Sequence, residues 1–169
     1  MKKLNQILAE GVYDPGIFKA FFLAGGPGSG KTFVTQSSFA GTGLKVVNSD
    51  KAFEMGLKKA NLSLKMPDEE EYFRNIIRQR AKTLTSSILD TYVKGRLGLV
   101  IDATGRDLSM IQRQHGLLTN LGYDCHMIFV NTSLDVALER NRNRPRSIPE
   151  YIVTNSWNGV QSNIGQFQR

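Results

Sequence analysis

The sequence predicts an α/β domain in which a doubly wound parallel sheet lies between two layers of helices. Short apolar segments alternate along the chain with longer segments of helical pattern, which is the order of βαβ units. A glycine-rich loop follows the first apolar segment directly, as it does where such a sheet binds phosphate. The length of 169 residues suits one domain with a sizeable core.

Four strands are expected, all of them short and apolar. The first is rich in aromatic residues and runs straight into the glycine-rich loop. The third is continuously apolar and ends in a carboxylate, Asp102. The expected strands cover residues 18–24, 44–48, 97–102 and 125–130.

The clearest helix is expected over residues 67–93. Pro67 and the acidic run 68–71 suit its first turn, because the helix dipole favours negative charge there. Apolar residues recur along it at helical spacing, and Gly95 suits a C-terminal cap.

Glycine and proline mark the ends of other helices. Two glycines follow the helix expected over residues 30–39. Pro145 ends the helix over 133–143, because the residue before a proline is pushed out of the helical region. Ser147 and Glu150 match a capping box for the last helix. Further helices are expected over residues 3–10, 50–60 and 108–121.

The chain is expected to consist of an N-terminal extension, residues 1–16, and one α/β domain, residues 17–169. A fifth strand at the edge of the sheet would be expected after the last helix, but the chain stops at Arg169.

The composition favours a cytoplasmic protein with an anionic partner. The net charge of +7 suits nucleotides, sugar nucleotides or nucleic acid, although a solvated basic surface without a specific partner explains it equally well. No apolar run approaches the length that crosses a bilayer, so no membrane partner is expected, and residues 1–10 lack the pattern of an export signal. Cys125 is the single cysteine, which excludes an intrachain disulfide.

The glycine-rich loop is the strongest functional signal, because it satisfies the phosphate-loop pattern G-x-x-x-x-G-K-[ST]. Its glycines let several backbone N–H groups point at one anion, and the following helix adds the positive end of its dipole. Lys31 would place its charge on the β- and γ-phosphates, and the Thr32 hydroxyl would ligate Mg²⁺. The predicted nucleotide-binding residues are Gly25, Gly26, Pro27, Gly28, Ser29, Gly30, Lys31 and Thr32.

Two carboxylates are expected near this loop. The strand ending in Asp102 resembles one whose aspartate holds Mg²⁺ through water, although an ordinary strand end is the alternative. No N-K-x-D motif for guanine follows, which argues against a GTPase. Asp50 follows the second strand, and ligands bind outside the carboxyl ends of such strands, so Asp50 should face the same crevice as Lys31. There it would accept the proton of an attacking hydroxyl, cap a helix, or do both.

An arginine-rich segment lies just before the last helix. It contains Arg140, Arg142, Arg144 and Arg146, and Pro145 places the last two in a loop. Guanidinium groups at the rim of the crevice would close over a triphosphate and stabilise charge on the transferring group. The alternative is a solvated basic helix end.

Four segments in this order resemble the zeta-toxin and phage polynucleotide-kinase branch (AAA_33-type) of the P-loop kinases. They are GGPGSGKT, NSD, LVIDATGRD and ALERNRNRPRSIP, and the resemblance covers residues 18–164. By analogy with P-loop kinases, the strand order should be 2-3-1-4. The segment VYDPGIFKAFFLAGGPGSGK is also similar to P-loop proteins of tailed bacteriophages, which implies a phage protein in the host cytoplasm or associated with the virion.

The resemblance implies roles for the residues that match its motifs. The residues implied for catalysis are Lys31, Asp50, Arg140 and Arg144, and those implied for the acceptor are Asp50, Asp102, Thr104 and Arg106. The nucleotide would be bound by residues 25–32 and Arg144. Mg²⁺ would be bound by Thr32 and Asp102.

Two positions depart from the family pattern. Phage polynucleotide kinases carry an arginine shortly after the general base, whereas this chain has Lys51, Ala52 and Phe53. The zeta pattern has glutamate where Asp102 stands. The acceptor is therefore left open among a polynucleotide, a nucleoside and a sugar nucleotide.

Together these features predict a kinase that uses ATP and Mg²⁺ to phosphorylate a hydroxyl group of a nucleotide-like acceptor. Two alternatives share the loop: a nucleotide-binding virion or assembly protein with little turnover, and an ATPase coupled to nucleic acid. The preference for ATP over GTP and the oligomeric state are left open.

Overall fold

The computed structural model describes residues 17–167 of the chain. Its four parallel strands form one sheet in the order β2-β3-β1-β4, which confirms the predicted α/β fold and strand order. The predicted extension, residues 1–16, and its helix over residues 3–10 lie outside the described residues. The strands are β1 (Lys19–Ala24), β2 (Lys45–Val47), β3 (Leu99–Asp102) and β4 (Asp124–Phe129).

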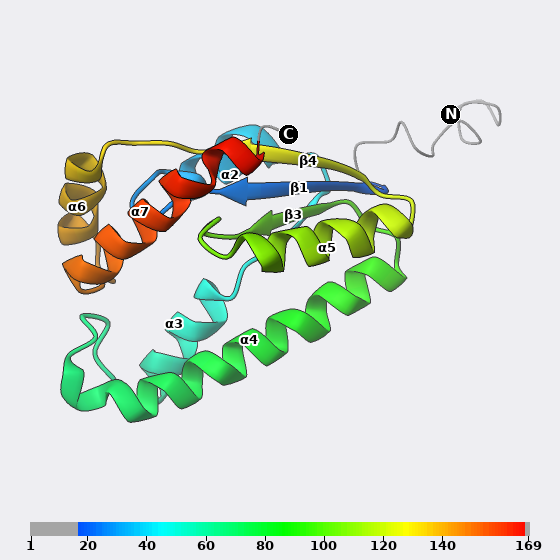
Figure 1. Ribbon diagram of the computed structural model, residues 1–169. Coiled ribbons are helices and arrows are strands. Elements are labelled where there is room, and N and C mark those ends of the chain that lie inside the picture. The colour runs from blue at the N-terminus through cyan, green and yellow to red at the C-terminus, as the bar shows by residue number, and fades with distance from the viewer. Residues whose placement is uncertain (1–16, 168–169) are drawn as a thin grey trace.

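Helices cover both faces of the sheet (Figure 1), as a doubly wound fold requires. One face packs on α2, and the opposite face packs on α4 and α5. Within residues 17–167, none of the helices has the length and apolar character needed to cross a membrane. The helices are α2 (Lys31–Phe39), α3 (Asp50–Lys59), α4 (Glu71–Lys94), α5 (Leu108–Asn120), α6 (Leu134–Asn143) and α7 (Glu150–Phe167).

The side chains of β1 point alternately to the two faces of the sheet, which explains why helices pack on both faces. Phe22 points into the main core, where it lies in one buried cluster with Ile111 and Leu118 of α5. Phe21 points to the other face, where its ring centroid lies 5.1 Å from that of Phe39 at the end of α2. Successive side chains of a strand point to opposite faces, so one strand packs on both helical layers.

A second core joins α3 to α4. Phe53 and Leu57 of α3 are buried against Met66 and against Ala81 of α4. Burial of large apolar side chains such as these contributes about 1.5–3 kcal/mol each. This packing fixes the position of the residue at which α3 begins, Asp50.

The parallel register brings the functional segments to one edge of the sheet. Leu23 of β1 pairs with Asp102 of β3, and Val47 of β2 pairs with Ile101. The loop after β1, residue 48 after β2, and Asp102 therefore meet at the carboxyl edge, where doubly wound sheets bind ligands.

The ends of two helices differ from the predictions. A separate 3₁₀ turn, residues 68–70, precedes α4, which begins at Glu71. The capping box predicted for Ser147 and Glu150 was wrong, because α7 begins at Glu150 itself. The carbonyl of Pro149 accepts the first hydrogen bonds of α7, and the Glu150 carboxylate pairs with Arg142.

Candidate nucleotide-binding site

The phosphate loop, residues 25–30, joins β1 to α2 and packs against α6. Gly28 has φ +83°, and a Cβ atom there would lie 2.5 Å from the carbonyl oxygen of Ala137 in α6. Gly30, directly before α2, has φ +107°, a conformation that side chains rarely adopt. Both positions therefore require glycine.

The Lys31 side chain lies along this loop. Its ammonium donates hydrogen bonds to the carbonyl oxygens of Gly25 at 2.6 Å and Gly26 at 3.4 Å, and it lies 3.9 Å from Asp102 Oδ1. Burial lowers the pKa of Lys31, whereas Asp102 and Asp50 act in the opposite direction. A buried ammonium held beside carbonyls is well placed to exchange them for phosphate oxygens.

Asp102 is the last residue of β3, at the carboxyl edge of the sheet. Its Oδ2 accepts a 2.6 Å hydrogen bond from the side-chain amide of Asn48. Burial raises the pKa of Asp102 and Asp50 raises it further, whereas Lys31 and Asn48 lower it. Asp102 is therefore a largely desolvated carboxyl group next to Lys31. A titratable group whose pKa is shifted by burial and by a charged neighbour is typical of functional sites.

Asp50 is the first residue of α3, and the alternative that it caps this helix was wrong. The cap position belongs to Ser49, and the backbone N–H of Asp50 donates to Asn48 Oδ1 at 2.7 Å. The Asp50 carboxylate is therefore free of the helix end and is 54% exposed. Both of its oxygens accept from Arg146, at 2.7 and 3.2 Å.

The two arginines predicted to be catalytic lie in different places. Arg140 is exposed and donates to the carbonyl oxygens of Gly28 at 3.2 Å and Ser29 at 3.4 Å, so it braces the phosphate loop. Arg144 directly follows α6, and its charge lowers the pKa of Lys31 after the larger effect of burial. Its Nε is buried without a hydrogen-bond partner among the described residues.

Thr104 and Arg106 follow β3. The carbonyl of Thr104 accepts from the N–H of Gly25 at 2.9 Å, so this segment borders the phosphate loop. The Arg106 side chain instead lies along α7, where a Cβ atom on Gly159 would be 2.6 Å from Arg106 Cγ. The structure thus brings Lys31, Asp50, Asp102 and Arg144 into one cluster and leaves Arg106 at its border.

The family model described as "AAA domain" (AAA_33) matches residues 21–166, which is most of the chain. The chain belongs to the AAA_33 family. The matched range contains every residue predicted for the site. Among curated proteins, none matches this chain in sequence.

Solved structures show that the AAA_33 chain has the fold of P-loop kinases. A chain of the Pnkp1/Rnl/Hen1 RNA repair complex superposes with a TM-score of 0.67 at 20% identity, covering 90% of this chain and 47% of that one. AvrRxo1-ORF1:-ORF2 with ATP gives 0.67 at 17% identity, covering 95% and 53%. Shikimate kinase from Acinetobacter baumannii in complex with shikimate gives 0.51 at 18%, covering 89% and 79%. The chain spans about half of the length of the first two.

The residues of this AAA_33 chain fit a nucleotide with a divalent metal. Thr32, in the first turn of α2, is exposed toward solvent. Within residues 17–167, no group of three His, Cys, Asp or Glu side chains is arranged to hold a metal. Mg²⁺ commonly binds through one or two protein oxygens, water and the phosphates of its substrate, so Thr32 and Asp102 stay predictions for a metal that would bind with the nucleotide.

Two residues that reasoning from sequence did not assign, Asn48 and Arg78, belong to the cluster, and Arg146 of the arginine-rich segment lies there too. Asn48 bonds to Asp102, Arg146 pairs with Asp50, and Arg78 of α4 lies with Arg146 over the ring of Phe53. Asn48 belongs to the NSD segment, so the sequence motif could have pointed to it. Arg78 belongs to no motif, and packing of α3 on α4 places it there.

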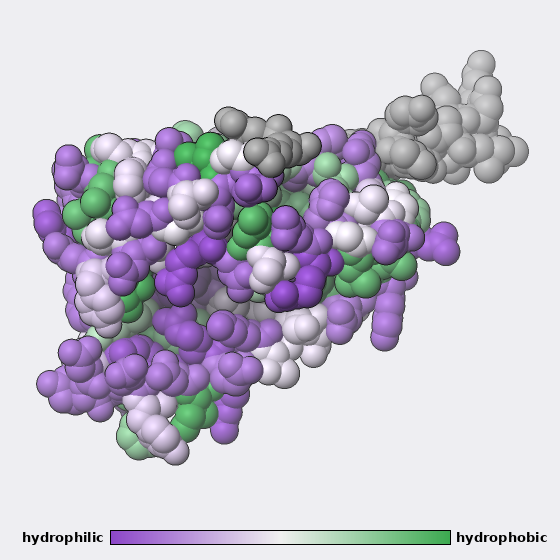
Figure 2. Space-filling model, viewed as in Figure 1, coloured by the Kyte–Doolittle hydropathy of each residue, from purple (hydrophilic) through white to green (hydrophobic). Residues whose placement is uncertain are grey.

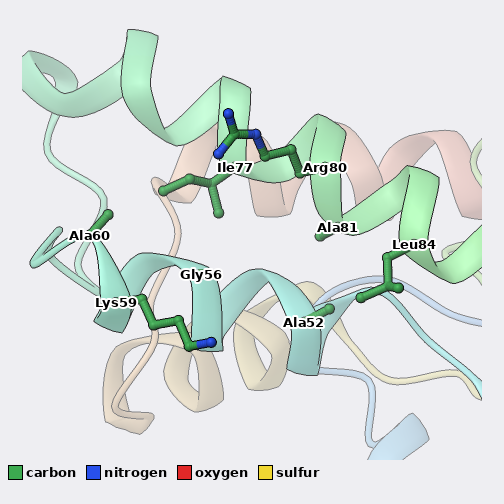
Figure 3. Close-up of a pocket in the computed structure, with 8 residues that line it drawn as sticks. All are labelled: Ala52, Gly56, Lys59, Ala60, Ile77, Arg80, Ala81 and Leu84. Carbon is green, nitrogen blue, oxygen red and sulfur yellow. The ribbon is translucent and has the colours of Figure 1, made fainter.

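A separate groove lies between α3 and α4 (Figure 3), with a volume of about 330 Å³. Its apolar walls come from Ala52 and Gly56 of α3 and from Ile77 of α4. Lys59 and Arg80 stand at its rim. None of the residues predicted for the nucleotide lines this groove, so it is distinct from the site at the sheet edge.

Proposed function

We propose that this chain transfers the γ-phosphoryl group of ATP to a hydroxyl group of a nucleotide-like acceptor. One observation carries the proposal. The phosphate-loop lysine, Lys31, lies in a single charge-coupled cluster with the buried carboxylate Asp102 and the exposed carboxylate Asp50. An exposed carboxylate at this place can accept the proton of an acceptor hydroxyl, which binding of a nucleotide alone does not require.

Nucleotide binding is assigned to the loop of residues 25–30, with Lys31, Thr32 and Arg144. The backbone N–H groups at the start of α2 and the charge of Lys31 suit the phosphates. The match to a structure with ATP supports ATP as the nucleotide. Mg²⁺, when bound with ATP, would neutralise phosphate charge, and Thr32 and Asp102 would hold it.

The transfer step is assigned to Asp50 and Arg144. Asp50 takes the proton of the acceptor hydroxyl, the hydroxyl oxygen bonds to the γ-phosphorus, and the bond from that phosphorus to ADP breaks. Arg144 stabilises the charge on the transferring group, and its partnerless Nε supports an anion there. Arg140 acts through the loop that it braces. Thr104 and Arg106 stay predictions for the acceptor side.

Incubation with γ-labelled ATP and a panel of acceptors tests the proposal. The panel contains 5′-hydroxyl oligonucleotides, nucleosides and UDP-sugars. We expect label on one class of acceptor, and loss of that label with retained ATP binding for Asp50→Asn. Asp90→Asn, an exposed carboxylate of α4, is the matched control and should keep activity.

Other outcomes of this experiment identify the alternatives. Label found only as free phosphate, released faster with DNA or RNA, would indicate an ATPase coupled to nucleic acid. ATP binding without turnover would indicate an assembly protein. The phage origin and the boundary between residues 16 and 17 stay predictions.

A further inference from the structure

The groove between α3 and α4 is walled by two helices that run side by side (Figure 3). On α3 the wall consists of small residues at four-residue spacing, Ala52, Gly56 and the cap residue Ala60. On α4 the apolar wall runs from Ile77 to Leu84. Residues at such spacing share one side of a helix, and two turns of helix span about 11 Å. The groove is therefore an elongated seam with a floor of small and apolar side chains.

Large apolar side chains are exposed around this seam. Phe73 lies one turn before Ile77 on α4 and is 60% exposed, and Leu84 at the other end is 52% exposed. Met55 of α3 is 58% exposed. Over the first turns of α4, at the lower left of Figure 2, hydrophobic side chains lie among hydrophilic ones. Exposed apolar side chains that gather around a hollow and have a charged rim mark an interaction surface.

The rim of the seam is positively charged on both sides. Lys59 stands on the α3 wall and Arg80 on the α4 wall (Figure 3). Within residues 17–167, neither of them has a carboxylate within 4.0 Å. The carboxylate of Glu54 on α3 already pairs with Lys58 at 2.9 Å. Two cations on opposite sides of an apolar floor are complementary to an apolar stripe that has negative charges on both flanks.

We infer that this groove binds an amphipathic helix of a partner protein, about three turns long, whose apolar stripe is flanked by acidic side chains. The stripe would lie over Gly56 and Ile77, and the acidic side chains would pair with Lys59 and Arg80. A helix laid along the seam of two others buries its apolar side chains between their ridges. A nucleic acid would match the two cations but would leave the apolar floor without a partner. The inference does not depend on the proposed function, because the groove is distinct from the nucleotide site.

Selection from a displayed library of helical peptides, about four turns long, tests the inference on the full chain. Every peptide carries apolar residues at positions i, i+3, i+4 and i+7, and the flanking positions vary among Glu, Lys and Gln. We expect the selected peptides to carry Glu at the flanks. By fluorescence anisotropy, a selected peptide should bind about tenfold more tightly than the same peptide with Lys in place of Glu.

Reversal of the rim charge tests where the peptide binds. In the double variant Lys59→Glu, Arg80→Glu, the preference should be inverted, so that the peptide with Lys binds more tightly. The control is Lys94→Glu, Arg113→Glu, which changes the net charge equally at exposed positions at the end of α4 and on α5. It should keep the preference for Glu. Both double variants should bind ATP as the parent protein does.

The apolar contribution is tested at Leu84. Leu84→Asn should weaken binding of the selected peptide by about tenfold, because its side chain becomes buried under the peptide. Leu117→Asn, at a similarly exposed leucine of α5, is the control and should bind the peptide as the parent does.

Several outcomes would overturn the inference. They are a selection that enriches no peptide or peptides without Glu at the flanks, and binding that is unchanged in both the Lys59→Glu, Arg80→Glu variant and the Leu84→Asn variant. A single-stranded oligonucleotide that binds this face more tightly than the selected peptide would indicate a nucleic-acid surface instead. A dimer of the parent protein that dissociates in Leu84→Asn would indicate that a second copy of this chain covers the groove.

Discussion

Asn48 makes hydrogen bonds to both aspartates of the site, to the side chain of Asp102 and to the backbone of Asp50. Its amide nitrogen donates to Asp102 Oδ2 at 2.6 Å, and its oxygen accepts from the backbone N–H of Asp50 at 2.7 Å. One side chain at the end of β2 thereby links the end of β3 to the start of α3. It positions Asp102 and Asp50 relative to each other.

Replacing Asn48 should therefore reduce turnover, although its side chain is small and uncharged. Asn48→Ala removes both bonds, and we expect kcat/KM to fall by about tenfold or more. Asn48→Asp keeps the size but places a second carboxylate against Asp102, so it should be worse and should need more Mg²⁺. Mg²⁺ titrations of phosphotransfer measure both effects. Asn120→Ala, at the exposed end of α5, is the control, and an equal loss there would contradict the argument.

Asp102 also gives the nucleotide-free protein a dependence on pH. Burial raises its pKa in the folded state above the value of about 3.9 in an unfolded chain. The folded state therefore binds this proton more tightly, so the contribution of Asp102 to stability is lost as pH rises through the raised pKa.

Asp102→Asn removes this ionisation. Relative to the parent, its free energy of unfolding should rise as the pH increases from about 4 through the raised pKa of Asp102. Urea unfolding across this range, without nucleotide, measures the difference. A difference that stays constant or shrinks with rising pH would contradict the assignment.

At the scale of elements, α3 and α4 approach closely where Gly56 faces Ile77. A Cβ atom on Gly56 would lie 2.4 Å from Ile77 Cγ2. Gly116, in the middle of α5, has open space around the same position. Both glycines are inside helices, so the difference between them lies in packing alone.

The same substitution should therefore have opposite effects at these two positions. Gly56→Ala should destabilise the fold by about 1–3 kcal/mol, because it forces α3 away from α4. Gly116→Ala should stabilise it by about 0.5–1 kcal/mol, because alanine is the better helix former. Denaturant unfolding measures both. Shifts of the same sign would show that α3 and α4 do not pack as described.

At the scale of the whole molecule, the nucleotide site joins elements from most of the chain. The phosphate loop contacts α6 at Ala137, and Asp50 of α3 pairs with Arg146, which follows α6. A ligand bound between these elements should oppose their separation. Nucleotide binding is thus expected to stabilise the entire domain.

Mg·ATP should raise the midpoint temperature of thermal unfolding, and this rise should require Lys31. At a concentration of 100 times Kd the stabilisation is about 2.7 kcal/mol. Lys31→Ala should abolish the shift, whereas Lys82→Ala, an exposed lysine of α4, should keep it. Thermal unfolding at increasing Mg·ATP measures both. An undiminished shift in Lys31→Ala would remove the basis for the nucleotide site.

Much of this fold was predictable because its signals are local. Apolar runs, the glycine loop and Pro145 placed the strands and helices to within two residues at most ends. The capping box at Ser147 failed because Pro149 and a partner on another helix, Arg142, decide where α7 begins and what Glu150 contacts.

The sequence by itself determined the phosphate loop, the alternation of strands and helices, and the carboxylate at the end of β3. Glycine geometry, hydrophobic periodicity and strand polarity act over a few neighbouring residues. Only the tertiary structure decided that Arg146 meets Asp50, that Arg140 braces the loop, and that Arg78 lies on Phe53. Those contacts join side chains far apart in the chain, and the packing of α3 on α4 and the path of the loop after α6 set them.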